Sequence, residues 1–110
     1  MQIFAYGRVR RAYIGAAGTA TPISRRVQRF FELASASGVH VMEIVKDSPA
    51  ALGGLRVGDR IVEVDGVAVD SVDGLQRTLD ASPIEWPVKI AVLRGTQKVD
   101  VEVTPVEQTG

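Results

Sequence analysis

The 110-residue sequence contains no cysteine, and its 13 basic side chains are balanced by 13 acidic ones. Without cysteine there is no disulfide bond and no thiolate metal site, and this absence by itself selects no compartment. A net charge of zero provides no overall field that would recruit nucleic acid or an acidic membrane. No apolar run approaches the roughly 20 residues of a membrane-spanning helix. We therefore expect an ordinary soluble domain without a nucleic-acid partner and without direct membrane insertion.

Catalytic and metal-binding constellations are also missing. A serine-protease triad needs a nucleophile, a base and an orienting carboxylate, but the sequence has one histidine, His40, within a valine-rich stretch, and no Gly-x-Ser-x-Gly turn. One histidine with scattered carboxylates does not provide the spacing of a metal site. We predict that this chain is not an enzyme and uses no cofactor or metal, and that His40 is an ordinary strand residue.

The first quarter of the chain is basic, because every charged residue up to position 29 is an arginine. Thr21 followed by Pro22 predicts the start of a helix that reaches Leu33. At helical spacing, one face of this helix is apolar and carries Ile23, Val27, Phe30 and Phe31. The opposite face is basic and carries Arg25, Arg26 and Arg29. Such a basic face is more often solvated than bound to lipid or nucleic acid.

The strongest local signals lie in residues 48–66, SPAALGGLRVGDRIVEVDG. The Ser-Pro pair at 48–49 predicts a helix start, and the glycines at 53–54 predict a left-handed helix end. We expect Leu55 and Val57 to pack inward. A strand should follow and end in a tight Asp-Gly turn. By themselves these residues predict a buried structural corner and name no chemistry.

Periodicity predicts the remaining elements. A strand over 39–45 is apolar at most positions, which indicates burial on both faces, and 88–93 with 98–103 alternate as a hairpin. A helix capped at 70–71 places Val72, Leu75 and Leu79 on one face, with Gln76 on its flank. The pattern predicts an α+β fold, namely a partly open β-barrel or sandwich of five to six strands capped by two to three helices.

The string SPAA-x-GGL-x-x-GD-x-I-x-x-x-DG resembles the central signature of bacterial PDZ domains, especially those of HtrA/Deg-type trypsin-like serine proteases. The resemblance implies the same architecture in the bacterial, permuted strand order. It implies that residues 1–11 link to a missing upstream protease domain, that 12–106 form the PDZ domain, and that 107–110 are a tail. The chain would then be the non-catalytic domain of a periplasmic or otherwise extracytoplasmic serine endopeptidase.

A second resemblance places the binding site. Tyr13-Ile14-Gly15-Ala16 is similar to the carboxylate-binding loop of this family, in which backbone N–H groups capture the C-terminus of a peptide. The resemblance implies that Ala16, Ala17 and Gly18 form the strand to which the peptide adds. It implies a pocket for the last side chain, formed by Ile14, Ala16, Val72, Leu75, Gln76 and Leu79. Without the resemblance, the helical part of this set reads as ordinary core.

Two features near the loop leave alternatives open. Ala16 is smaller than the residue that the family usually has, so the pocket either favours a bulky apolar last side chain or binds more weakly. Arg10 and Arg11 precede the loop and either attract the carboxylate or remain solvated, since exposed charges contribute under about 1 kcal/mol.

The function that the resemblance implies is capture of C-termini, or of extended apolar segments, of misfolded protein substrates by β-strand addition, in service of an HtrA-type protease. The implied partners are peptides with an apolar last residue and the protease domain of the parent chain. One alternative is a PDZ domain of another membrane-associated or tail-specific protease, or of a secretion subunit. The other is an assembly or regulatory module that does not bind free peptide.

Overall fold

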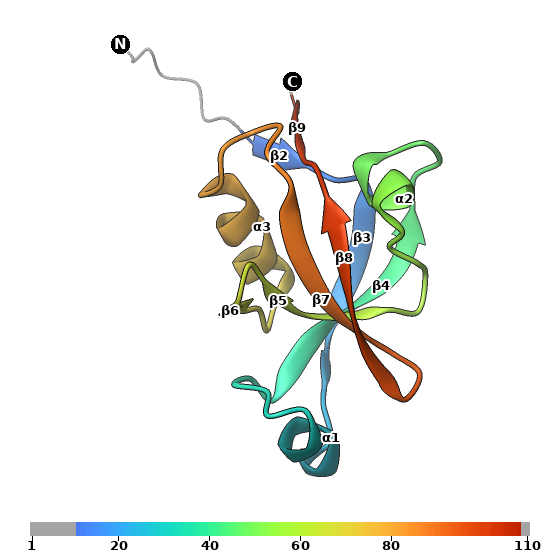
Figure 1. Cartoon of the computed structure of the whole chain (residues 1–110), viewed down its shortest axis with the longest axis vertical. Coiled ribbons are helices and arrows are strands. Elements are labelled where there is room, and N and C mark those ends of the chain that lie inside the picture. Colours follow the sequence, from blue (N-terminus) through green and yellow to red (C-terminus); the bar gives the residue numbers. More distant parts are fainter. Residues whose placement is uncertain (1–10, 109–110) are drawn as a thin grey trace.

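A six-stranded antiparallel sheet forms the body of the protein in a computed structural model that describes residues 11–108 (Figure 1). Five strands follow the order β3-β4-β5-β7-β8, and β6 pairs with β5 only. The strands are β3 (Ala16–Pro22), β4 (Ser37–Ile44), β5 (Arg60–Val64), β6 (Val67–Ala68), β7 (Val88–Arg94) and β8 (Gln97–Val103). Because β3 and β8 are edges, the sheet is open and does not close into a barrel. The predicted α+β class is confirmed.

Between residues 11 and 108, three short helices accompany the sheet: α1 (Arg25–Phe30), α2 (Pro49–Gly53) and α3 (Val72–Asp80). Each begins at a serine, Ser24, Ser48 or Ser71, whose hydroxyl accepts a hydrogen bond from an amide of the first turn. The predicted helix start at Thr21 was wrong, because β3 continues through Pro22. Proline is tolerated there since it ends an edge strand. No helix within residues 11–108 is long and apolar enough to cross a membrane.

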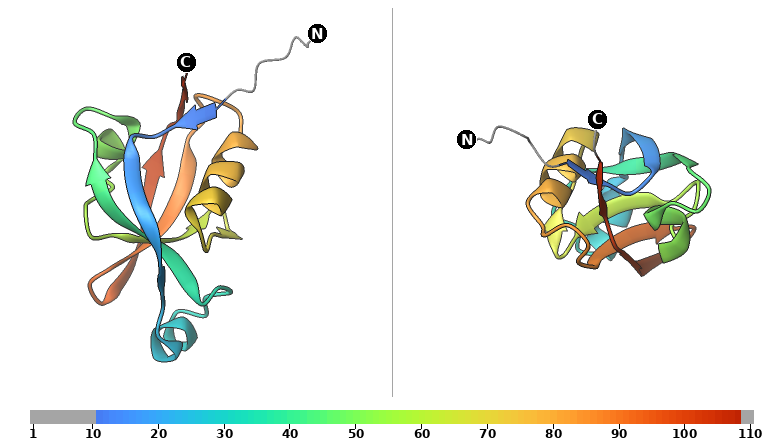
Figure 2. Two further views of the ribbon diagram at one scale, coloured as in Figure 1. Left: turned by 180° about the vertical axis from the view of Figure 1, so that it is seen from behind. Right: turned by 90° about the horizontal axis from the view of Figure 1, so that it is seen from above.

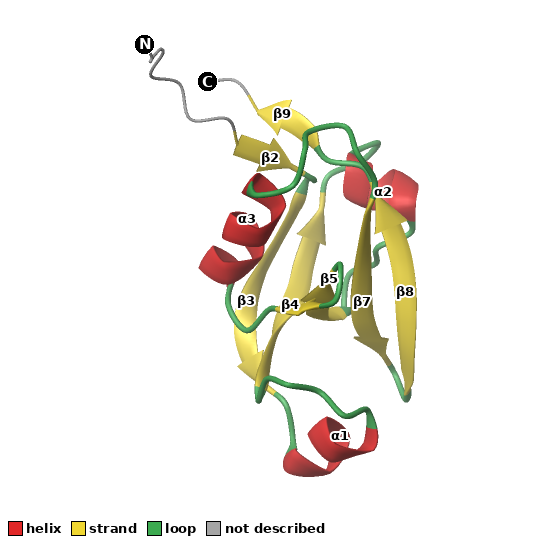
Figure 3. Cartoon of the chain, turned by 60° about the vertical axis from the view of Figure 1, so that its left-hand side comes forward, coloured by secondary structure: helices red, strands yellow, loops and turns green. Residues whose placement is uncertain are grey.

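A small second sheet joins the two ends of the described chain. In it β2 (Arg11–Tyr13) pairs with β9 (Val106–Gln108) in antiparallel register, so that Arg11 lies opposite Gln108. The pair sits beside α3, at the end of the molecule opposite α1 (Figure 3). Two residues expected in the tail, 107 and 108, are thus part of a strand.

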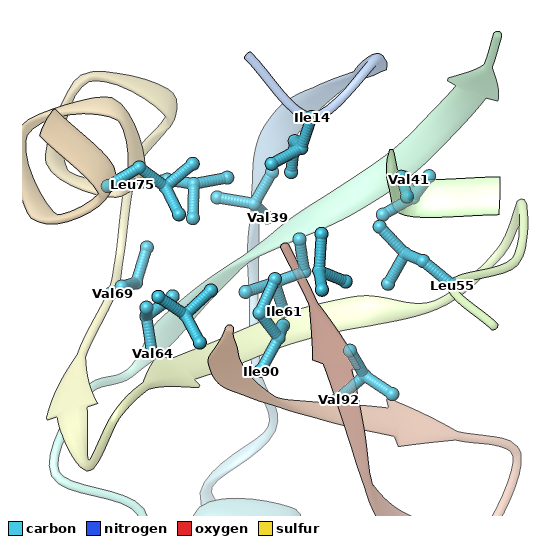
Figure 4. Packing of buried hydrophobic residues seen from close by; sticks show 14 of the residues in the cluster. Ile14, Val39, Val41, Leu55, Ile61, Val64, Val69, Leu75, Ile90 and Val92 are labelled. Carbon is cyan, nitrogen blue, oxygen red and sulfur yellow. The ribbon is translucent and has the colours of Figure 1, made fainter. Parts of the chain in front are cut away.

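The main core lies between the sheet and the helices α2 and α3. Figure 4 shows Leu75 of α3 and Ile14 on the side of the sheet that carries Val39. The core members with exposures of 2% or less come from β4, β5, β7 and β8, from α2 and α3, and from the segment before α3: Val39, Val41, Ala50, Ile61, Val64, Val69, Leu79, Val88, Ile90, Val92 and Val103. A smaller cluster on the other side of the sheet packs Ile23 and Leu33, which flank α1, against the strands.

Two burial predictions were wrong. Met42 and Val45 are 58% and 54% exposed, although the apolar run indicated burial on both faces of β4. Met42 points away from the covered face, which carries Val39 and Val41, since side chains of a strand alternate between faces. Val45 lies beyond the end of β4 at Ile44. Leu55 is buried as predicted, but Val57 is 62% exposed in the turn before β5.

Candidate functional site

The loop Tyr13–Ala16, which we call the carboxylate loop after the role that the sequence predicts for it, connects β2 to β3 and is held from three sides. The Ala50 amide of α2 donates to the Ile14 carbonyl at 2.8 Å, and the Val45 amide donates to the Gly15 carbonyl at 2.8 Å. The Gln76 side chain donates to the carbonyl of Ala12, just before the loop, at 2.9 Å. The loop carbonyls are therefore directed at the scaffold. Within residues 11–108 the amides of Ile14 and Gly15 take part in no hydrogen bond, which leaves them for an external acceptor.

Gly15 is required by its conformation and by its surroundings. Its φ of +80° lies in the left-handed region, which costs other residues roughly 1–2 kcal/mol. A Cβ at this position would lie 2.3 Å from Cβ of Ser48 and 2.7 Å from its Oγ. Ser48 is 5% exposed and caps α2. The Ser-Pro signature therefore packs directly against the carboxylate loop.

Beyond the loop, β3 presents one free edge. It pairs with β4 over its whole length, and within the described residues no strand pairs with its other side. The register shifts between Ala17 and Gly18, where a Cβ on Gly18 would lie 2.3 Å from the carbonyl oxygen of His40. His40 is a half-buried β4 residue opposite Thr19, as predicted for an ordinary strand residue.

Helix α3 lies beside this free edge (Figure 2). The helix and the edge enclose a groove of about 270 Å³. Eight of the residues predicted for the site line it: Ile14, Ala16, Ala17, Gly18, Val72, Leu75, Gln76 and Leu79. Tyr13 and Gly15 shape the loop without lining the groove. The sequence prediction missed the floor, formed by Val39, Val41 and Ile61. Their strand pattern predicts core, and no local signal shows that the groove reaches them.

The α3 residues divide into core and groove wall. Leu75 and Leu79 are 8% and 2% exposed and belong to the main core, although both also line the groove. Val72, in the first turn, is 43% exposed. The two predicted roles therefore coexist at the leucines, whereas Val72 serves the wall of the groove more than the core.

Charge contributes little inside the groove, whose lining is apolar except for Gln76. Arg11 is exposed in β2, and Arg10 lies outside the described residues, so their attraction for a carboxylate stays a prediction. Among residues 11–108 there is no cluster of three histidine or acidic side chains that could hold a metal ion.

A free sheet edge facing a helix, with a glycine loop closing one end of the groove between them, defines the PDZ class of domains. The PDZ domain family matches residues 18–104, and the chain belongs to this family. Within that class it is similar to the PDZ domains of HtrA/Deg-type serine proteases. It is 34% identical over 98 residues to a probable periplasmic serine endoprotease, DegP-like, of Halomonas elongata. The matched region covers 89% of this chain and 20% of that protein.

Two solved structures share the fold. The HtrA-type protease AlgW with decapeptide superposes with a TM-score of 0.77 at 25% identity, over 99% of this chain and 33% of that one. The HtrA3 PDZ domain bound to a phage-derived ligand, FGRWV, gives 0.66 at 26% identity, over 88% of this chain and 86% of that one.

The chain spans about a fifth of the length of its Halomonas elongata relative. The part that it matches is the PDZ domain, which confirms the prediction of a non-catalytic module. The relative is named as periplasmic, in agreement with the extracytoplasmic location expected for the parent protein.

Proposed function

We propose that this domain captures the C-terminus, or an extended apolar segment, of protein substrates by β-strand addition, and that it serves an HtrA-type serine protease. The observation that carries the proposal is the groove between the free edge of β3 and α3, closed at one end by the carboxylate loop. Further support comes from the two similar proteins whose structures contain a decapeptide and the ligand FGRWV.

The direction of the peptide follows from the position of the loop at the start of β3. A peptide whose carboxylate meets the amides of Ile14 and Gly15 runs antiparallel to β3 and exchanges main-chain hydrogen bonds with it. Side chains of an extended peptide alternate, so the last residue and the one two before it face α3. The last side chain enters between Ala16 and the α3 leucines.

The small wall residues indicate which last side chain fits. Ala16 and Gly18 leave space on the strand side, and the groove descends to Val39 and Val41, each 2% exposed or less. A bulky apolar side chain would bury more surface there than a small one, at about 25 cal/mol per Å². Of the two consequences left open for Ala16, the depth of the groove favours the bulky ligand. We expect affinity near 1 μM, about −8 kcal/mol.

Amidation of the peptide tests the role of the carboxylate. The probe is the tightest binder from a library of peptides with randomised C-terminal residues, and titration calorimetry compares its free acid with its amide. We expect the amide to bind about 10 to 100 times more weakly, because hydrogen bonds to a charged group contribute about 1.5–3 kcal/mol. Equal affinity of the two forms would contradict carboxylate capture. A flat response across the whole library would favour the assembly or regulatory module.

Substitution of Val72 separates the groove from the core. Val72→Asp should weaken binding of the free-acid probe at least tenfold, since it places a charge in the apolar wall of the groove. The free energy of unfolding should change by under about 1 kcal/mol, because the side chain is 43% exposed.

Val57→Asp is the matched control for this substitution, because Val57 is 62% exposed and does not line the groove. It introduces the same charge and should leave the affinity unchanged. Titration calorimetry and urea denaturation measure both variants. Loss of binding in both, or in neither, would contradict the assignment of Val72 to the groove.

A further inference from the structure

Asp80, the last residue of α3, closes a ring of hydrogen bonds with the chain that enters the carboxylate loop. Its Oδ1 accepts from the Ala12 amide at 2.8 Å, across 68 positions of sequence. The Gln76 side-chain nitrogen donates both to Oδ1 of Asp80 at 2.9 Å and to the Ala12 carbonyl at 2.9 Å. Both backbone polar groups of Ala12 are therefore bound by side chains of the groove helix.

The position of Asp80 is unfavourable for the helix itself. Carbonyl groups at a helix C-terminus carry partial negative charge, so an acidic residue in the last turn is disfavoured. Helix α3 already has Asp73 in its first turn, where an acidic side chain is favourable. The hydrogen bond from the Ala12 amide, and not the stability of α3, accounts for a carboxylate at position 80.

The ring is placed where it sets the width of the groove at the loop. Ala12 is 3% exposed and directly precedes the loop, whose other side is fixed by Ala50 of α2 and by the contact with Ser48. Gln76 lines the groove and also belongs to the ring. Without the tie to α3, the loop amides would keep their anchor on α2 but lose their fixed distance from the groove helix.

We propose that Asp80 is a positioning residue for peptide capture, which holds Ala12 against α3 and thereby sets the distance between the loop amides and the α3 wall. This proposal rests on the proposed function, because it names the device that aligns the two halves of the same groove. It assigns Asp80 no contact with the peptide. Its role depends on the acceptor oxygen of the side chain and not on its charge.

Three variants test the positioning role with the free-acid library probe. Asp80→Ala should weaken binding about tenfold, because the peptide must then order the segment that the lost hydrogen bond held, at the cost of about one hydrogen bond. Asp80→Asn keeps an acceptor oxygen and removes the charge that the helix end disfavours, so it should bind within about twofold of the wild type. Asp73→Ala removes an exposed acid of the same helix that is outside the ring, and should also bind like the wild type.

Amide hydrogen exchange provides a readout at the ring itself. The Ala12 amide should exchange faster in Asp80→Ala and at the wild-type rate in Asp80→Asn. If Asp80→Ala does not fold, Gln76→Met replaces it, because this change removes the donor to Ala12 and Asp80 at similar length and should accelerate Ala12 exchange and weaken binding.

The outcomes separate the two proposals. A wild-type protein that binds no library peptide overturns the proposed function, and the positioning role with it. A wild-type protein that binds, with Asp80→Ala binding equally well or Asp80→Asn binding as weakly as Asp80→Ala, overturns the positioning role alone.

Discussion

Asp59→Ala is expected to lower the free energy of unfolding by about 3 kcal/mol, near the lower end of the range for breaking a buried ion pair. Asp59 is 2% exposed and accepts three hydrogen bonds: from Arg94 Nε at 2.8 Å, from Arg94 Nη2 at 2.7 Å and from the Arg56 amide at 2.9 Å. The pair joins the Gly-Asp of the signature to the end of β7. Because 27% of the Arg94 side chain is exposed, water reaches the guanidinium after the loss of its partner and limits the cost.

Acid should remove the stabilisation that the Asp59–Arg94 pair provides, because it protonates Asp59. Burial by itself raises the pKa of Asp59, but hydrogen bonds from Arg94 and from the Arg56 amide, together with the two positive charges, outweigh it and hold the pKa below its usual value. The pKa of this carboxyl in the unfolded chain is about 3.9. The stabilisation is therefore fully present above about pH 4 and is lost as the pH falls further, toward the pKa of the folded state. Asp59→Ala should lack this component of acid sensitivity.

Urea denaturation at pH 7 and at pH 3 measures both effects, and Glu63→Ala is the matched control. Glu63 pairs with Lys98 at 3.4 Å, with side chains 25% and 30% exposed, so its loss should cost under about 1 kcal/mol at either pH. If the two variants lose the same stability at pH 7, Asp59 does not form the strong pair that the geometry indicates.

Gly15→Ala is expected to destabilise the domain by about 3 kcal/mol and to abolish detectable peptide capture. About 1–2 kcal/mol comes from the positive φ, and overlap with Ser48 adds strain of about 1–3 kcal/mol. Relief of the overlap would displace either Ser48, which caps α2, or the loop whose amides would bind the carboxylate. Urea denaturation and titration with the free-acid probe measure the two losses.

Gly58→Ala separates strain from overlap. Gly58 has a φ of +97°, and a Cβ there would meet nothing within 4 Å. Gly58→Ala should lower the free energy of unfolding only by the cost of the left-handed backbone conformation, about 1–2 kcal/mol, and should leave peptide binding intact. If both variants lost equal stability, the contact between Gly15 and Ser48 would not be a constraint.

Elements with local signals were predicted well. Ser48 caps α2 through the Ala51 amide, and Gly54 ends that helix with a φ of +96°, because both features depend on hydrogen bonds between residues a few positions apart. The Asp65-Gly66 turn has φ values of +50° and +81°, as a tight hairpin turn requires. Local signals failed at Thr21-Pro22, because pairing of β3 with β4 outweighed the helix-start pattern.

The candidate site was predictable in part. The spacing of Val72, Leu75 and Leu79 and the resemblance of the loop identified two of its walls, and the structure brings them together around one groove. The exposure of individual apolar residues was not predictable, since Val57 and Met42 depend on which face of the chain another element covers.

The sequence by itself determined the caps of α2 and α3, the left-handed end of α2, the Asp-Gly turn and the family, because each is encoded in residues that are neighbours along the chain. Only the tertiary structure decided that Ser48 packs against Gly15, that Val39 and Val41 floor the groove, and that Asp80 holds Ala12. These contacts join segments far apart in the sequence, and they form only when the sheet brings β2, α2 and α3 to the same end of the domain.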